Sequence, residues 1–407
     1  MRSQPLGTDT ESPARRRWAG PDWFTPNVRT LCGVSLLQDA ASEMLYPILP
    51  LFLTVTLGAP VAVVGIVEGV AEAIASAVKI AAGRLGDNVS RRPLVAAGYG
   101  LAALGKLVLA TATAWPTVLA ARGVDRVGKG IRSAPRDALL MVGADPTHKG
   151  RIFGVHRAAD TLGAVIGPAL GLALYELLDH AIRPLLWIAV APAALSVLLV
   201  FAVRETPTRS KVSAAAATDP KSAPSRLPAR LRALIGILAV FGLVNFPDTL
   251  LLLRAHDLGL STAAVIAAYI CYNLSYAALP YPAGALSDRV PRHRVFAAGL
   301  VCFAIGYLGL GLVSSPGWVF VVLPVYGGFA AATDGVGKAW ISQLAPPDRQ
   351  SSAQGLYQGL SGGSILVAGL WAGLAWHTGP HPLPLLISGA IALVLAVGLA
   401  VFGGRLR

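Results

Sequence analysis

Long apolar segments recur along the whole chain and restrict its fold more than any other feature. Each has about 20 residues, the length that an α-helix needs to cross a bilayer core of about 30 Å. Of the 407 residues, 54% are hydrophobic and only 14% are charged, whereas a soluble domain has about 25% charged residues. The segments are much longer than a typical β-strand of about five or six residues, which argues against a soluble α/β enzyme. Twelve membrane-spanning helices are expected, at 31–54, 63–84, 93–113, 117–140, 151–176, 184–203, 231–253, 262–285, 294–313, 317–342, 351–375 and 382–402.

Positive charge is distributed unevenly between the loops on the two sides of these helices. The chain holds 34 Lys and Arg against 21 Asp and Glu, a formal net charge of +13. If the N-terminus is cytoplasmic, the opposite loops hold essentially Arg183 and Arg254, and the remaining loop charges lie on the side of the termini. This asymmetry follows the positive-inside rule and predicts that both termini are cytoplasmic. It also accounts for the basic surplus without a nucleic-acid partner.

A polar stretch at 204–230, rich in Ser, Ala, Pro and Lys, is typical of a flexible linker. Six predicted helices precede it and six follow. The predicted organisation is a cytoplasmic tail at 1–30, a six-helix bundle at 31–203, a cytoplasmic linker at 204–230 and a second six-helix bundle at 231–407.

The two halves share a short basic loop between their second and third helices. Residues 83–92 read GRLGDNVSRR, and residues 284–294 read GALSDRVPRHR. Two copies of Gly-x-Leu-x-Asp followed by basic residues, at equivalent places in two equal halves, indicate an internal repeat.

The repeated loop resembles the signature G-x-L-a-D-r-x-g-r-r of the major facilitator superfamily, and the likeness extends from residue 31 to residue 403. The resemblance implies an all-α membrane protein with twelve transmembrane helices in two pseudo-symmetric six-helix bundles. In that family the bundles rock about a central site to give alternating access. It further implies a cytoplasmic latch, in which Asp87 holds basic residues and a helix N-terminus of the other half. The latch residues would be Gly83, Asp87, Arg91, Arg92, Gly284, Asp288 and Arg292.

The fifth predicted helix contains Gly163-AVI-Gly167-Pro168-AL-Gly171. This matches the pattern G-x-x-x-G-P-x-x-G, which in the superfamily is associated with antiporters. The three glycines share one face and allow a neighbouring helix to approach closely. Pro168 removes a backbone hydrogen bond and permits a bend. Ordinary packing by small residues is the alternative interpretation.

Ionisable residues inside the helices are the candidates for function, because a charge at the bilayer centre costs at least about 2.5–3.5 kcal/mol. Asp39 and Glu43 lie one turn apart on one face of the first helix. Two carboxylates this close disfavour joint ionisation, so one of them is expected to hold a proton near neutral pH. Glu68, Glu72 and Lys79 share a stripe of the second helix. The sequence leaves open whether Glu72 couples protons or stabilises the bundle.

The fourth helix is the most charged. Gly123-VDRV-Gly128-Lys129 resembles a nucleotide-binding loop, but Gly130 replaces the Ser or Thr that would hold magnesium. Residues 126–130 instead resemble the superfamily pattern R-x-x-q-G, with Lys129 in place of glutamine. The resemblance implies that Arg126 serves proton transfer or substrate charge, and the adjacent Asp125 is expected to act with it. The proton-coupling candidates are therefore Asp39, Glu43, Glu72, Asp125 and Arg126. Arg132, Arg136 and Asp137 are interpreted as the cytoplasmic end of this helix.

The second half has fewer ionisable residues inside its helices and is expected to shape the substrate cavity. The candidates are Asn245, Asp248, Tyr272, Asn273, Asp334 and Lys338. Asp334 and Lys338 are spaced i, i+4, which predicts that they compensate each other.

Four segments together resemble one bacterial subgroup of the superfamily: SEMLYPILPLFL, DRVGKGIRSAPRDALL, GVHRAADTLGAVIGP and TDGVGKA. Members of this subgroup read DRxGKGIRxAPRDAL on the fourth helix. On the tenth helix, Asp334 and Gly337 replace two glutamates of the subgroup, which argues against an acid-based role there. The resemblance does not indicate a substrate.

These observations predict a secondary active transporter of the bacterial cytoplasmic (inner) membrane that moves a small solute by proton-coupled efflux. Its expected partners are the solute, protons and membrane lipid, with no nucleic acid, and it is expected to act as a monomer. A proton-coupled uptake symporter shares every feature except the fifth-helix pattern. Met44, His156 and Cys271 are scattered, which disfavours a metal-ion carrier, and no metal or cofactor is implied. No nucleophile–base constellation indicates an enzyme.

Overall fold

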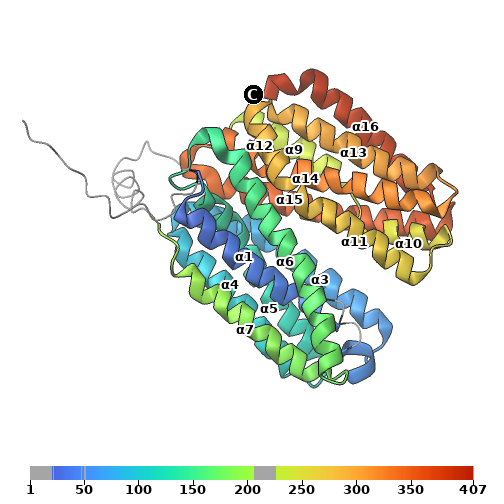
Figure 1. Ribbon diagram of the computed structural model, residues 1–407. Helices are drawn as coiled ribbons and strands as arrows, with labels where there is room; N and C mark the ends of the chain where they lie inside the picture. Colours follow the sequence, from blue (N-terminus) through green and yellow to red (C-terminus); the bar gives the residue numbers. More distant parts are fainter. Residues whose placement is uncertain (1–20, 22, 47, 50–51, 206–225, 407) are drawn as a thin grey trace, which may run out of the picture.

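The computed structural model describes residues 21, 23–46, 48–49, 52–205 and 226–406, so most of the predicted tail and linker lie outside the described residues. Within this part of the chain there are fourteen α-helices and no strand (Figure 1). The all-helical prediction is confirmed. Seven helices are long and apolar enough to cross a membrane, by length and composition alone.

The first half folds into six long helices. They are α1 (Pro26–Leu45), α3 (Val61–Asn88), α4 (Arg91–Ala110), α5 (Trp115–Leu140), α6 (Lys149–Leu177) and α7 (Ile182–Val200). α1 begins where the Thr25 side chain accepts a hydrogen bond from the Val28 amide. The expected helix at 31–54 is not continuous, because α1 ends at Leu45 and a separate π-helical turn covers Phe52–Thr56. α5 packs between α3 and α4, and α1 packs against α6 and α7.

The second half holds eight helices where six were expected. They are α9 (Ala229–Gly242), α10 (Thr249–Asp257), α11 (Thr262–Ala278), α12 (Pro280–Arg289), α13 (Arg292–Leu312), α14 (Val319–Leu344), α15 (Gln350–Thr378) and α16 (Leu383–Phe402). The expected single helices at 231–253 and 262–285 are each broken. Pro247 lies in the first break and Pro280 follows Leu279 at the second. Proline lacks an amide hydrogen and its ring clashes with the preceding turn, which explains both interruptions.

The two bundles come together at the end that holds the 83–92 and 284–294 loops and diverge at the other end (Figure 1). α3 packs against α15, and α6 packs against α12 and α14. Glycine makes the first approach possible, since a Cβ on Gly83 would lie 2.7 Å from the Ser351 carbonyl oxygen. At this end, therefore, the halves are in backbone contact.

Each half has its own core. In the second half, aromatic rings of α9, α13 and α14 form one cluster, in which Phe303 stacks on Tyr307 with ring centroids 3.9 Å apart. The buried residues of the first half divide into two clusters. Packing is thus strongest inside each bundle, and the space between the bundles is left for polar side chains.

Candidate functional site

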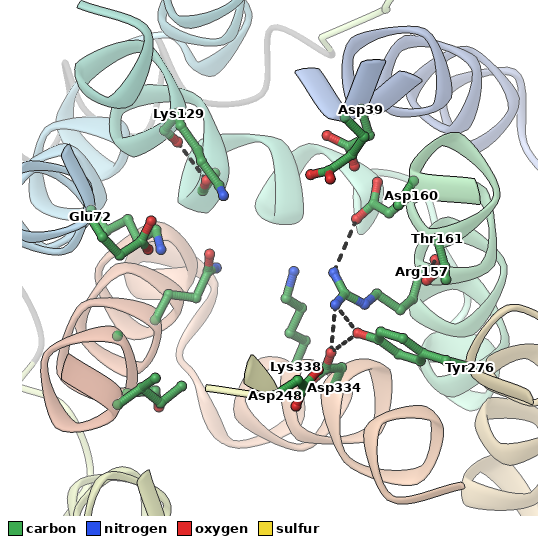
Figure 2. A pocket seen from close by; sticks show the side chains of 18 of the residues that line it. Asp39, Glu72, Lys129, Arg157, Asp160, Thr161, Asp248, Tyr276, Asp334 and Lys338 are labelled. Atoms are coloured by element: carbon green, nitrogen blue, oxygen red, sulfur yellow. Dashed lines mark hydrogen bonds and ion pairs between the residues drawn. The ribbon is translucent and has the colours of Figure 1, made fainter. Parts of the chain in front are cut away.

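A central cavity of about 490 Å³ lies between the two bundles. α1, α3, α5 and α6 line it from the first half, and α11, α14, α15 and the end of the α9–α10 break line it from the second. Its lining includes six acidic and six basic side chains, several of which are labelled in Figure 2. The twelve are Asp39, Glu43, Glu72, Lys79, Lys129, Arg132, Arg136, Arg157, Asp160, Asp248, Asp334 and Lys338.

The acids of α1 have no cationic partner. Asp39 and Glu43 both line the cavity, and no Lys, Arg or His nitrogen of the described residues lies within 4.0 Å of either carboxylate. Behind them α6 approaches α1 closely: a Cβ on Gly163 would lie 2.6 Å from the Leu36 carbonyl oxygen, and one on Gly167 would lie 2.6 Å from that of Ala40. The fifth-helix glycines therefore position α1 against the cavity.

Glu72 of α3 lines the cavity and lies 4.0 Å from Arg126 Nε. Arg126 itself is not among the lining residues; it stands behind Glu72, 3.9 Å from Glu68. Lys79 and Lys129 line the same wall, and neither has a carboxylate within 4.0 Å in the described part of the chain. This wall therefore presents two ammonium groups to the cavity.

Asp125 does not lie with the other coupling candidates. Its carboxylate is 3.2 Å from Lys106 Nζ, and both side chains are buried between α4 and α5. A Cβ on Gly105 would meet the Asp125 Cβ at 3.0 Å, so this contact is tightly packed. The partner of Asp125 is on α4, outside the cavity lining, and its expected action with Arg126 in proton coupling stays a prediction.

Arg132, Arg136 and Asp137 lie in the last turns of α5, but they are not a solvent-exposed helix end. Arg132 and Arg136 line the cavity, and Asp137 is fully buried. The Asp137 carboxylate lies 2.9 Å from Lys338 Nζ and accepts a hydrogen bond from Gln358 at 2.9 Å. Asp137 thus joins α5 of the first half to α14 and α15 of the second.

The prediction that Asp334 and Lys338 compensate each other is also wrong. Lys338 pairs with Asp137, and Asp334 lies 2.8 Å from Arg157 Nη2 of α6. Figure 2 shows Arg157 between Asp160 and Asp334, with Tyr276 bonded to both Arg157 and Asp334. Each of these two ion pairs thus joins a residue of the first half to a residue of the second. Helical spacing carries no signal for such contacts, and sequence reasoning missed them.

The α9–α10 break places Asp248 at the cavity. Its carboxylate accepts hydrogen bonds from Tyr272 at 3.0 Å and Tyr326 at 2.8 Å. Tyr272 and Asn273 of α11, both expected among the cavity residues, line it. Asn245, expected among the cavity residues, lies in the break but outside the lining.

The first repeated loop contacts the other half directly. The Asp87 carboxylate accepts hydrogen bonds from the Ser351 and Ser352 amides, at 2.9 and 2.8 Å, at the N-terminus of α15. Arg91 Nε donates to the Ser351 hydroxyl at 3.2 Å. Arg92 instead stays within its own half, donating to the Phe201 carbonyl. A carboxylate at a helix N-terminus is stabilised by the unpaired amides and the helix dipole.

The second loop makes the same contact in the opposite direction. Asp288 accepts hydrogen bonds from the Gly150 and Arg151 amides, at 2.7 and 3.0 Å, at the N-terminus of α6. Arg292 lies 3.4 Å from Asp288 and donates to Gln343. A Cβ on Gly284 would clash with the Gly150 carbonyl oxygen, so this approach also requires glycine. Such contacts are those that a latch needs, although its role in the transport cycle stays a prediction.

Among the described residues, no group of three or more His, Cys, Asp or Glu side chains could hold a metal ion. Cys32, Cys271 and Cys302 are free thiols.

Sequence comparisons identify one family. The sequence model of the Major Facilitator Superfamily matches residues 31–269 and 233–405. An uncharacterized MFS-type transporter of Methanocaldococcus jannaschii is 32% identical over 365 residues, 88% of this chain and 90% of that protein. A puromycin resistance protein of Streptomyces alboniger is 30% identical over 176 residues, 42% of this chain and only 35% of that protein.

Solved structures share the fold. The human organic anion transporter has a TM-score of 0.76 at 18% identity, covering 92% of this chain and 99% of that one. The E. coli fucose:proton symporter has a TM-score of 0.74 at 15% identity, covering 93% and 98%. The predicted fold of twelve transmembrane helices is confirmed. The fourteen described helices give these twelve spans, because α9 with α10 and α11 with α12 each form one broken span.

Proposed function

The chain belongs to the Major Facilitator Superfamily of membrane transporters, and from that premise we propose that it exports a polar, charged small solute in exchange for protons. One observation supports the proposed coupling of solute transport to protons. Asp39 and Glu43 are cavity carboxylates without a cationic partner among the described residues, whereas Glu72, Asp160 and Asp334 each have one within 4.0 Å. Asp248, the sixth acid of the lining, also lacks a cation but accepts hydrogen bonds from Tyr272 and Tyr326. An unpaired carboxylate in a partly dehydrated cavity takes up a proton more readily than one held by a cation. Protonation of Asp39 or Glu43 alternates with solute binding in the proposed cycle.

The lining supports a polar solute. Ionisable side chains dominate it, and Lys79 and Lys129 supply positive charge opposite the acids of α1. A solute that carries charge of its own would offset the cost of dehydrating these groups, whereas a purely apolar one would not.

The outward direction has two supports. The Gly163–Gly171 pattern matches that of antiporters, and the Streptomyces alboniger relative is named for resistance to puromycin. Uptake by proton symport is the second candidate, because the superfamily fold also serves the E. coli fucose:proton symporter.

We further propose that the protein lies in the bacterial cytoplasmic membrane as a monomer with both termini in the cytoplasm, which the loop charge asymmetry supports. In that orientation the cavity of this structure opens outward and the repeated loops close the cytoplasmic side. The DRVGKGIRSAPRDAL stretch supports the assignment to the bacterial subgroup.

The test uses inside-out vesicles that contain the protein and hold an imposed proton gradient. Puromycin, amino acids, polyamines and sugar phosphates are added in turn, and a pH-sensitive dye reports proton efflux. At least one charged compound is expected to release protons with the native protein and not with Glu43→Gln or Asp39→Asn. Glu176→Gln, which changes an exposed carboxylate on α6, is the matched control and should behave as the native protein. Solute flux that ignores the proton gradient and survives both cavity substitutions would refute the coupling.

A further inference from the structure

A second cavity, of about 530 Å³, lies at the end where the bundles meet. It is bounded by the last turns of α3, by the first turn of α9 with the residues before it, and by the start of α15, which packs against both other helices. We call it the arginine pocket. Its lining residues are Ile80, Arg84, Asn88, Arg226, Leu227, Arg232, Arg349, Ser352 and Leu356, and none of them lines the central cavity.

The pocket is strongly basic. Four of its nine lining residues are arginines, and none is acidic. Arg84, Arg226 and Arg232 have no carboxylate within 4.0 Å in the part of the chain that the structure describes. Like charges gathered around one cavity repel each other, so an anion between them is stabilised. Guanidinium groups bind phosphate with paired hydrogen bonds, which makes a phosphate group the best match.

The same pocket has an apolar side. Ile80, Leu227 and Leu356 line it together with the arginines. One turn beyond Leu356 on α15, the Leu360 side chain is 39% exposed, and α15 is among the helices that are apolar enough to span a membrane. A free phosphate ion makes no use of such surface. A phospholipid does, because its headgroup is anionic and its acyl chains are apolar.

We propose that the arginine pocket binds the headgroup of an anionic phospholipid, with its acyl chains along α15. Basic pockets between transmembrane helices are known sites for anionic headgroups. Arg84 belongs to the first half, whereas Arg232 and Arg349 belong to the second and Arg226 lies just before α9, so a bound headgroup joins the two bundles. The Ser352 amide in this pocket is also the donor to Asp87. The lipid therefore stabilises the state in which the bundles meet at this end.

The test measures binding of phosphatidylglycerol to the purified full-length protein in detergent, with phosphatidylcholine and inorganic phosphate as separate probes. The variant Arg84→Gln/Arg226→Gln/Arg232→Gln removes three pocket charges. Each arginine near an anionic lipid contributes about 1 kcal/mol, so its loss is expected to weaken binding about fivefold. The triple variant is therefore expected to bind phosphatidylglycerol about a hundredfold more weakly. The control Arg289→Gln/Arg294→Gln/Arg405→Gln removes the same charge from exposed arginines outside the pocket and should change binding less than twofold.

Equal weakening in both triple variants would overturn the proposal, because it would show that net charge alone attracts the lipid. Competition by millimolar inorganic phosphate as effective as that by phosphatidylglycerol would overturn the lipid assignment in favour of a free anion. If the triple variant is not monodisperse, the same binding measurement is made with the single variants Arg84→Gln and Arg232→Gln. Each is expected to weaken binding about fivefold, and unchanged binding in both would overturn the proposal.

Discussion

Asp137 shows how much one residue contributes to the contact between the bundles. It is fully buried and lies between Lys338 of the other half, at 2.9 Å, and Arg136 of its own helix, at 3.3 Å. A buried ion pair adds little net stability, but removal of one partner leaves a charge without compensation. We therefore expect the pair to contribute more to the alignment of α5 with α14 than to net stability.

At the residue scale, we expect Lys338→Met to destabilise the protein by about 3 kcal/mol. This is at the low end of the usual cost of breaking a buried pair, because Arg136 still faces Asp137. The destabilisation is measured as the difference in the free energy of unfolding in detergent between the variant and the native protein. The double variant Asp137→Asn/Lys338→Met should recover at least half of the loss. Equal destabilisation in the single and double variants would show that the pair is not coupled.

At the scale of elements, glycine determines how close α1 and α6 lie. Gly163, Gly167 and Gly171 face successive carbonyl oxygens of α1, each of which a Cβ would approach to 2.6 or 2.7 Å. Backbone atoms cannot move aside as a flexible side chain can. The three positions therefore act as one packing surface, which also holds Asp39 and Glu43 at the cavity.

We expect Gly167→Ala to lower the free energy of unfolding by about 1–3 kcal/mol, the usual cost of overpacking. Gly100→Ala is the matched control, because a Cβ there meets nothing within 4 Å. In a helix, that control should be neutral or stabilising by up to about 1 kcal/mol. Thermal unfolding of both variants in the same detergent provides the comparison, and equal shifts would contradict the close-packing argument.

At the scale of the whole molecule, two carboxylates link the halves, each by accepting hydrogen bonds from amides at the N-terminus of a helix in the other half. Asp87 binds the N-terminus of α15, and Asp288 binds the N-terminus of α6. Both lie at the end where the bundles meet, so both must release their amides if the bundles separate there. The repeat in the sequence thus becomes a pair of symmetric contacts in the fold.

We expect Asp87→Asn to shift the population toward the state that is open at this end. A charge at a helix N-terminus contributes about 0.3–2 kcal/mol, which corresponds to a roughly two- to thirtyfold change in the equilibrium. Spin labels at Val55→Cys and Leu312→Cys, both exposed at the diverging end, report the change as a shorter distance. The native cysteines are first replaced by serine. Asp145→Asn, in an exposed loop, should leave the distance distribution unchanged, and no shift in Asp87→Asn would contradict a latch role.

The sequence by itself determined the helical class, the twelve spans and the repeated loop. These depend on local features: the length of apolar runs and short motifs that survive any rearrangement of the helices. The two proline breaks were also local, but the prediction joined the residues on either side of Pro247 and of Pro280 into single helices.

Only the tertiary structure decided which charges meet. Asp334 binds Arg157 and Lys338 binds Asp137, although the helical spacing of Asp334 and Lys338 suggested that they pair with each other. Asp125 binds Lys106, a partner that the spacing along the helix did not indicate. A partner on another helix depends on how each helix is rotated and how the two bundles are aligned. Those quantities follow from packing of the whole molecule, because a buried charge takes the nearest opposite charge that the fold presents, not the nearest in sequence.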